Sequence, residues 1–274
     1  MSVTRSLAAT LLALALLGLT SCAGPAVTTA ASTGTPTFYW SAAQETYAAG
    51  DYIKTADHLE HLIDGRNEYK DQAIPWYLVL TSGITAGYME VADSYSMGAH
   101  INKKSALDFY RRASDFRTIA SRYALRFGQN IDKLNQIPLG IVRLPFGLPK
   151  GNPAPPAELA KITRGIELAP GDVETAQLLN IQRNVLLTVC RAAGAPNDLA
   201  KTEEILGRPS ASVSRVTFAG AVAAELDREA TLYARDKLDE PEKLAIFRRL
   251  AQNALQEGAK SGSARFVPIG SLSQ

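Results

Sequence analysis

Apolar side chains recur every three or four positions through most of this 274-residue chain, and that spacing indicates helices. The clearest stripe places six residues on one face of a helix: Phe109, Ala113, Phe116, Ala120, Tyr123 and Phe127. Apart from one proline-rich segment, no alternating run flanked by hairpin turns indicates strands. We therefore predict an all-α fold, with helices over 37–49, 52–64, 72–97, 102–128, 156–168, 172–193, 198–206, 212–238 and 240–257.

The amino terminus has the pattern of a lipoprotein signal peptide. Arg5 precedes a Leu- and Ala-rich run over 7–19, which is too short for a typical membrane-spanning helix. The run ends in LTSC at 19–22, which resembles the bacterial lipobox. In that family a thioether-linked diacylglycerol is placed on the cysteine before cleavage, and the new amine is acylated. The resemblance predicts a lipidated Cys22, and the alternative is an ordinary signal peptide with an incidental cysteine.

A lipid on this cysteine implies a location on a membrane of the cell envelope. In the enterobacterial sorting pattern, Asp directly after the lipidated cysteine keeps a lipoprotein in the inner membrane. This chain has Ala23 at that position, which implies the outer membrane, facing the periplasm. Once the signal peptide over 1–21 is removed, residues 22–36 are small, Thr-rich and almost uncharged, which predicts a flexible tether. We expect a folded helical domain over 37–258 and a loose tail over 259–274.

The sequence gives little support for catalysis or metal binding. His58 and His61 lie one helical turn apart and could share a metal ion, but His100 is the only other histidine. We favour a polar helix face there and predict no metal and no cofactor. The sequence has no Gly-x-Ser-x-Gly elbow, no phosphate-cradling glycine loop and no Cys-x-x-Cys pair, so we predict a protein that is not an enzyme.

Charge and cysteine content restrict the remaining choices. A formal net charge of +2 gives no overall reason to expect nucleic acid as a partner. Cys190 lies in an apolar helical stretch, which predicts a buried structural thiol. If Cys22 is lipidated, the chain has no second thiol for an intramolecular disulfide.

The first predicted helix pair resembles a tetratricopeptide repeat. The matching residues are Trp40-x-x-Ala43, the corner Ala49-Gly50-Asp51-Tyr52, and Thr55-Ala56-x-x-Leu59-x-x-Leu62. Thr55 stands where the family has Ala, and Asn67 where it often has Pro. No second copy is as clear. The resemblance implies an irregular stack of antiparallel helices, which would present a concave surface to an extended peptide or another helical protein.

A second resemblance covers about residues 45–130. A repeat-like pair is followed by the long helix "WYLVLTSGITAGYMEVADSYSMGA" and the basic-aromatic helix "SALDFYRRASDFRTIASRYALRFG". This order is similar to the T-component lipoproteins of TRAP transporters, which form an all-helical assembly pierced by a pore and are thought to dock with a periplasmic solute-binding protein. The resemblance implies an accessory component that binds a small-molecule ligand. No pore residue can be transferred, because the rest of the chain does not follow the pattern.

Two regions are candidate contact surfaces. The predicted helix over 102–128 has seven basic residues and only two acidic ones, Asp108 and Asp115. The basic residues are Lys103, Lys104, Arg111, Arg112, Arg117, Arg122 and Arg126. They form either an anion-reading surface for lipid headgroups, an acidic solute or an acidic partner, or a solvated face neutralised by Glu203, Glu204 or Glu225. The segment 137–156 holds six of the fourteen prolines, so its apolar residues either drape over the core or form a docking arm.

We expect a membrane-anchored, non-catalytic adaptor that contacts an envelope or periplasmic protein. The candidate contact residues are Tyr47, Tyr52, Arg122, Arg126 and Phe146. The alternative is the accessory ligand-binding component of a solute transport system. A continuous internal cavity lined by polar groups would favour the alternative, and an open groove over a solid core would favour the adaptor.

Overall fold

The computed structural model describes residues 32–137 and 140–259, and over these residues it is all-α, as predicted. The helices are α2 (Pro36–Ala49), α3 (Tyr52–Ile63), α4 (Lys70–Ile101), α5 (Ala106–Asn130), α6 (Ala157–Thr163), α7 (Pro170–Ala192), α8 (Leu199–Leu206), α9 (Arg215–Ala230) and α10 (Pro241–Ala259). Two 3₁₀ turns, η2 (Ile131–Gln136) and η3 (Thr231–Tyr233), follow α5 and α9. The predicted signal peptide, lipidation at Cys22, most of the tether and most of the tail lie outside the described residues.

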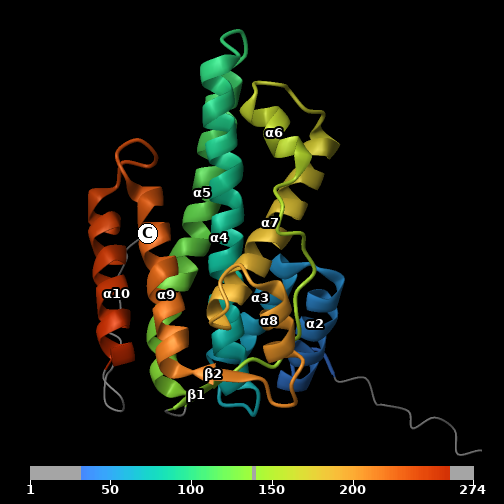
Figure 1. Ribbon diagram of the computed structural model, residues 1–274, viewed down its shortest axis with the longest axis vertical. Helices are drawn as coiled ribbons and strands as arrows, with labels where there is room; N and C mark the ends of the chain where they lie inside the picture. Colours follow the sequence, from blue (N-terminus) through green and yellow to red (C-terminus); the bar gives the residue numbers. More distant parts are fainter. Residues whose placement is uncertain (1–31, 138–139, 260–274) are drawn as a thin grey trace, which may run out of the picture. The chain divides into compact units, whose positions relative to one another are not determined.

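Helix α4 is the centre of the compact unit that begins at Thr33. It packs against α3, α5, α6, α7 and α9, and its side chains from Ala73 to Met89 are buried without interruption. A helix that is apolar on all sides has to be enclosed by other elements. Figure 1 shows α4 and α5 side by side, with α9 and α10 on one side and α7, α2 and α3 on the other.

The pair α2–α3 begins and ends close to the predicted boundaries because its ends carry strong local signals. The Thr35 side chain accepts a hydrogen bond from Phe38 N at 3.2 Å, and Pro36 occupies the first turn. Gly50 closes α2 with φ +83°, a conformation that favours glycine. Asp51 then caps α3 by accepting from Lys54 N at 3.2 Å.

The proline-rich segment drapes over the helical core. Val142, Leu144 and Phe146 are buried, and the Phe146 ring lies 5.2 Å from the Trp76 ring and 4.9 Å from the Tyr47 ring between centroids. Alternate burial fits the strand β1 (Ile141–Arg143), which pairs antiparallel with β2 (Ser212–Ser214). Of the two arrangements considered for this segment, the structure has the drape and not a free arm.

Four predicted helices differ from the structure by more than two residues at an end. Helix α4 ends at Ile101 and not at 97, and α5 begins at Ala106 and not at 102. The helix expected over 212–238 begins only at Arg215, because 212–214 pairs with β1, and it ends at Ala230 before η3. The helix expected over 156–168 ends at Thr163, since Gly165 adopts φ +76° and stops it.

Helices α4 and α7 approach each other closely at two glycines. A Cβ at Gly83 would lie 2.7 Å from Val185 Cα, and one at Gly87 would lie 2.9 Å from Ile181 Cα. The Asn180 side chain donates to the Gly87 carbonyl oxygen at 2.8 Å across the same interface. Backbone contact of this kind cannot be relieved by rotating a side chain, so both positions require glycine.

We expect Gly83→Ala to lower the free energy of unfolding by about 1–3 kcal/mol, because α7 has to move away from α4. Gly220→Ala is the matched control, since a Cβ at Gly220 in α9 meets nothing within 4 Å. There the gain in helix propensity should raise stability by about 0.5–1 kcal/mol. Urea denaturation of both variants measures the difference, and equal effects would contradict the close packing.

Candidate functional site

The three aromatic residues proposed for partner contact lie in the core. Tyr47, Tyr52 and Phe146 are all buried. The Tyr47 hydroxyl donates to the Gly147 carbonyl oxygen at 2.7 Å, and the Tyr52 hydroxyl donates to the Lys150 carbonyl oxygen at 2.8 Å. Burial raises the pKa of both phenols above its ordinary value. These residues hold the proline-rich segment in place and are left out of the binding surface proposed below.

Of the two arginines proposed on α5, Arg126 forms ion pairs within the fold and Arg122 lies exposed at the surface. Arg126 Nη2 lies 2.8 Å from Asp57 Oδ1 and 2.5 Å from Glu60 Oε2, which joins α5 to α3. Arg122 is exposed. The neutralising partners of Arg126 are therefore on α3. They are not Glu203, Glu204 or Glu225, which sequence reasoning had offered.

His61 and Cys190 both contact other side chains of the fold. The His61 ring stacks on Tyr39 with 4.1 Å between centroids. Within the described ranges, no group of three or more His, Cys, Asp or Glu side chains is placed to hold a metal ion. Cys190 is fully buried, which confirms the predicted structural thiol.

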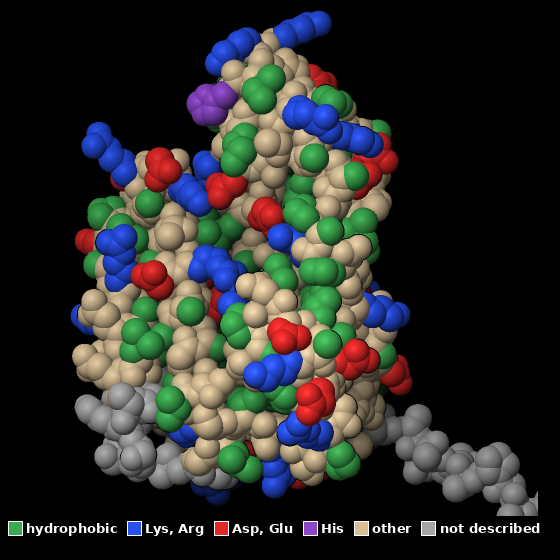
Figure 2. Space-filling model, in the orientation of Figure 1, with side chains coloured by type: hydrophobic (Ala, Val, Ile, Leu, Met, Phe, Trp, Pro, Cys, Tyr) green, Lys and Arg blue, Asp and Glu red, His purple; other side chains and the backbone are tan. Residues whose placement is uncertain are grey.

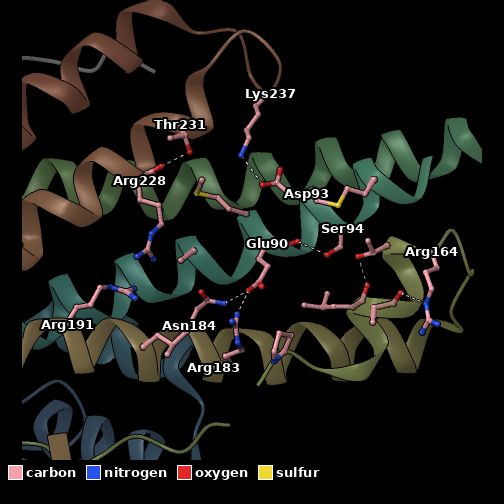
Figure 3. Close-up of a pocket in the computed structure, with 18 residues that line it drawn as sticks. Glu90, Asp93, Ser94, Arg164, Arg183, Asn184, Arg191, Arg228, Thr231 and Lys237 are labelled. Carbon is pink, nitrogen blue, oxygen red and sulfur yellow. Dashed lines mark hydrogen bonds and ion pairs between the residues drawn. The ribbon is translucent and has the colours of Figure 1, made fainter. Parts of the chain in front are cut away.

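An open cleft of about 870 Å³ lies between α4, α6, α7 and the α9–α10 region (Figure 3). Seven charged side chains line it: Glu90, Asp93, Arg164, Arg183, Arg191, Arg228 and Lys237. Met89, Met97, Leu159 and Leu187 supply apolar surface between them. Figure 2 shows Lys, Arg, Asp and Glu side chains around a hollow on this face of the molecule. Sequence reasoning singled out none of these residues as a site.

Helical periodicity brings the lining residues to one side of each helix. On α4 they are Ala86 and the residues three, four, seven, eight and eleven positions later: Met89, Glu90, Asp93, Ser94 and Met97. On α7 they are Arg183, Asn184, Leu187 and Arg191. The available sequence signal was the appearance of Glu90 and Asp93 at helical spacing inside an otherwise apolar helix.

Two acidic residues of α4 are neutralised by cations from other elements. Glu90 Oε2 lies 2.7 Å from Arg183 Nη1 and accepts a hydrogen bond from Asn184 Nδ2 at 2.8 Å. Asp93 pairs with Lys237 Nζ at 2.9 Å and, more loosely, with Arg117 Nη2 at 3.6 Å. These pairs join α4 to α7 and to the turn before α10.

Glu225 on α9 is buried behind the cleft and pairs with two arginines. Its carboxylate lies 2.5 Å from Arg191 Nε and 3.1 Å from Arg228 Nη1, and the Ser82 hydroxyl donates to it at 3.1 Å. Burial lowers the pKa of Arg191, and the nearby Glu225 charge partly offsets that effect. Two guanidinium groups therefore share one carboxylate at the cleft wall.

The cleft and the groups directly behind it carry excess positive charge. Arg164 Nε donates only to the Ala160 carbonyl oxygen, at 3.1 Å, and has no ion pair in the described part of the chain. In this network six cations face three carboxylates: Arg117, Arg164, Arg183, Arg191, Arg228 and Lys237 against Glu90, Asp93 and Glu225. A partly enclosed excess of this sign attracts anions.

Glu229 lies one helical turn beyond Glu225 and is completely buried. The Ser82 hydroxyl donates to Glu225, and both Glu229 carboxyl oxygens lack a hydrogen-bond partner in the described structure. Burial first, and the Glu225 charge second, raise the pKa of Glu229 well above its ordinary value. The two neighbouring carboxyl groups thus differ: Glu225 is paired with cations, and Glu229 favours its protonated form.

Comparison of the chain with protein-family models, curated proteins and solved structures finds no match in any of the three. Within residues 32–137 and 140–259, no helix combines the length and apolar character needed to cross a membrane.

We expect Glu229→Gln to gain stability relative to the wild type as the pH rises from about 4 to about 7. In the wild type, an unfolded glutamate loses its proton above about pH 4.3, whereas the buried Glu229 keeps it, so folding becomes less favourable as the pH rises. Glutamine is neutral throughout and lacks this loss. Urea denaturation across this pH range measures the effect, and parallel curves for the two proteins would contradict it.

Glu225→Gln is the control for this comparison, because it leaves Arg191 and Arg228 without their shared carboxylate. We expect it to lower the free energy of unfolding at neutral pH by about 2–3 kcal/mol. This is less than a fully enclosed pair would cost, since the Arg228 side chain is 35% exposed.

Proposed function

We propose that this protein is a non-catalytic binding component of the cell envelope, which is anchored by a lipid on Cys22 and holds an anionic small molecule in the basic cleft. The sharing of Glu225 by Arg191 and Arg228 is the observation that carries this proposal. One carboxylate compensates only one of these two charges, and a bound anion would compensate the other.

The two arginines have hydrogen-bond donors to spare. Arg191 uses Nε on Glu225 and Nη2 on Thr188, and Arg228 uses Nη1 on Glu225. Each guanidinium has five N–H donors, arranged to match the paired oxygens of a carboxylate or phosphate. Figure 3 shows Arg228 directed from α9 toward Arg191 on α7. The remaining donors of both side chains can therefore converge on one anionic group.

The shape and apolar lining of the cleft restrict the rest of the ligand. The lining extends along α4 from Ala86 to Met97, which at about 1.5 Å per residue corresponds to about 16 Å. Met89 and Leu187 offer apolar surface within this length. These features suit an organic anion with an apolar body better than a bare inorganic ion.

Ligand binding is better supported than the adaptor role expected from the repeat-like helices. The adaptor required contact residues at the surface, whereas Tyr47, Tyr52 and Phe146 are in the core. The cleft is open and is not the continuous internal cavity expected of the alternative. Its charged lining and small-molecule size are the features that favour the alternative, an accessory component of a solute transport system. An envelope or periplasmic protein is then the partner that delivers or receives the ligand.

We expect the purified full chain to bind phenyl phosphate more tightly than benzyl alcohol, because only the phosphate pairs with the arginines. Arg228→Gln should weaken phenyl phosphate binding about tenfold, the usual effect of losing a charge-assisted hydrogen bond. Arg122→Gln removes an exposed arginine outside the cleft and is the matched control. Isothermal titration calorimetry measures all three proteins. Equal losses in both variants, or equal affinity for the neutral alcohol, would contradict the proposal.

We expect the wild-type chain to incorporate labelled palmitate in a bacterial host, and Cys22→Ser to incorporate none, because the lipid donor reacts with sulfur. Cys190→Ala should keep the label, since that thiol is buried in α7. Label retained by Cys22→Ser would show that the lipobox resemblance is misleading.

A further inference from the structure

The turn between α4 and α5 concentrates exposed apolar side chains. Of the ten large hydrophobic residues that are most exposed in the described structure, four lie in or beside it: Met97, Ile101, Leu107 and Tyr110. Leu107 is 83% exposed and Ile101 is 61% exposed. Ile166, a fifth member, lies in the turn after α6 that packs on the end of α4. Figure 1 shows this end of α4 and α5 projecting beyond the neighbouring helices.

The turn is held in a fixed conformation by hydrogen bonds. Asn102 N donates to the Gly98 carbonyl oxygen at 2.8 Å, and the Asn102 side chain donates to the Gly165 carbonyl oxygen at 2.9 Å. Ser105 N donates to Asn102 Oδ1 at 3.2 Å. The Phe109 ring is buried against Gly98. Ile101 and Leu107 are therefore exposed on an ordered support.

Two consecutive lysines lie between the exposed apolar residues. Lys103 and Lys104 are exposed, and neither pairs with a carboxylate in the described part of the chain. Arg111, about two turns further on, pairs with Asp108 at 3.4 Å. Figure 2 shows Lys and Arg side chains at this end of the molecule. Glu167 contacts the turn by accepting a hydrogen bond from the Ser105 hydroxyl, but it pairs with neither lysine. The surface thus combines two lysines that lack an ion pair in the described structure with apolar side chains on a convex projection.

We propose that this hydrophobic-basic turn, residues 101–107, docks on the surface of a bilayer that contains anionic lipids. Ile101 and Leu107 would enter the boundary between headgroups and acyl chains, while Lys103 and Lys104 would contact lipid phosphates. A convex turn with separate apolar side chains suits a fluid bilayer, whereas a protein partner would need a matching cavity. This contact is independent of the cleft, and it would add a second attachment to the lipid proposed for Cys22.

The test places a fluorophore on the turn of the full chain, reconstituted in vesicles of equal parts phosphatidylcholine and phosphatidylglycerol. Trp40 and Trp76 are buried, so Leu107→Trp adds an exposed tryptophan over a shielded background. Brominated acyl chains quench tryptophan only on contact. In one experiment the brominated lipid is in the vesicles that carry the protein. In a second experiment it is in protein-free vesicles that are added to them. The two experiments detect contact of the turn with its own membrane and with a second membrane, respectively.

We expect quenching of Leu107→Trp in at least one arrangement, and little in vesicles of phosphatidylcholine alone. Adding Lys103→Glu and Lys104→Glu should lower the ratio of docked to free turn by about fivefold or more for each lysine. Val216→Trp is the control, because Val216 is also exposed, by 56%, and lies in the first turn of α9, beside β2 and at the other end of the molecule (Figure 1). The proposal would be overturned if Leu107→Trp were quenched no more than Val216→Trp, or equally in vesicles with and without phosphatidylglycerol. It would also be overturned if the turn bound a protein and did not contact lipid.

Discussion

The enclosure of α4 by other helices determines where the rest of the molecule lies. Its apolar residues have to be covered on all sides, and α5, α7, α3 and α9 provide that cover. Gly83 and Gly87 let the α7 backbone come into direct contact, which fixes the separation of the two helices. Just beyond this contact α4 turns Glu90 and Asp93 outward, and α7, α5 and the turn before α10 supply the cations that pair with them.

Carboxylates in and behind the cleft are shared between cations. Asp93 and Glu225 each contact two cations, so the site has more guanidinium and ammonium groups than carboxylates. Glu229 could have restored the balance, but its complete burial without hydrogen bonds favours the uncharged form. Desolvation of one carboxyl group thus helps to keep the wall of the cleft positive.

Local signals made the helices predictable, whereas the site depends on contacts between distant segments. Thr35, Gly50 and Asp51 determine the ends of α2 and α3 through their own backbone neighbours, and those ends were predicted to within one residue. β2 was missed because three residues form a strand only when β1 is beside them. Tyr47 and Tyr52 were assigned to a surface because the segment that covers them is about 100 residues away. The cleft likewise needs α4, α7 and α9 together, and no single stretch shows that.

The hydrogen bonds from Tyr47 and Tyr52 to the proline-rich segment have a consequence for how the chain reaches its folded state. They connect positions 100 and 98 residues apart, and Phe146 completes the same aromatic cluster. As the chain emerges during synthesis, α2 and α3 appear well before the residues that seal them, so Trp40 and Trp76 stay uncovered for that interval. Contacts over such separations also slow folding. A delay of this kind keeps the chain open, as the passage across a membrane implied by the proposed envelope location would require.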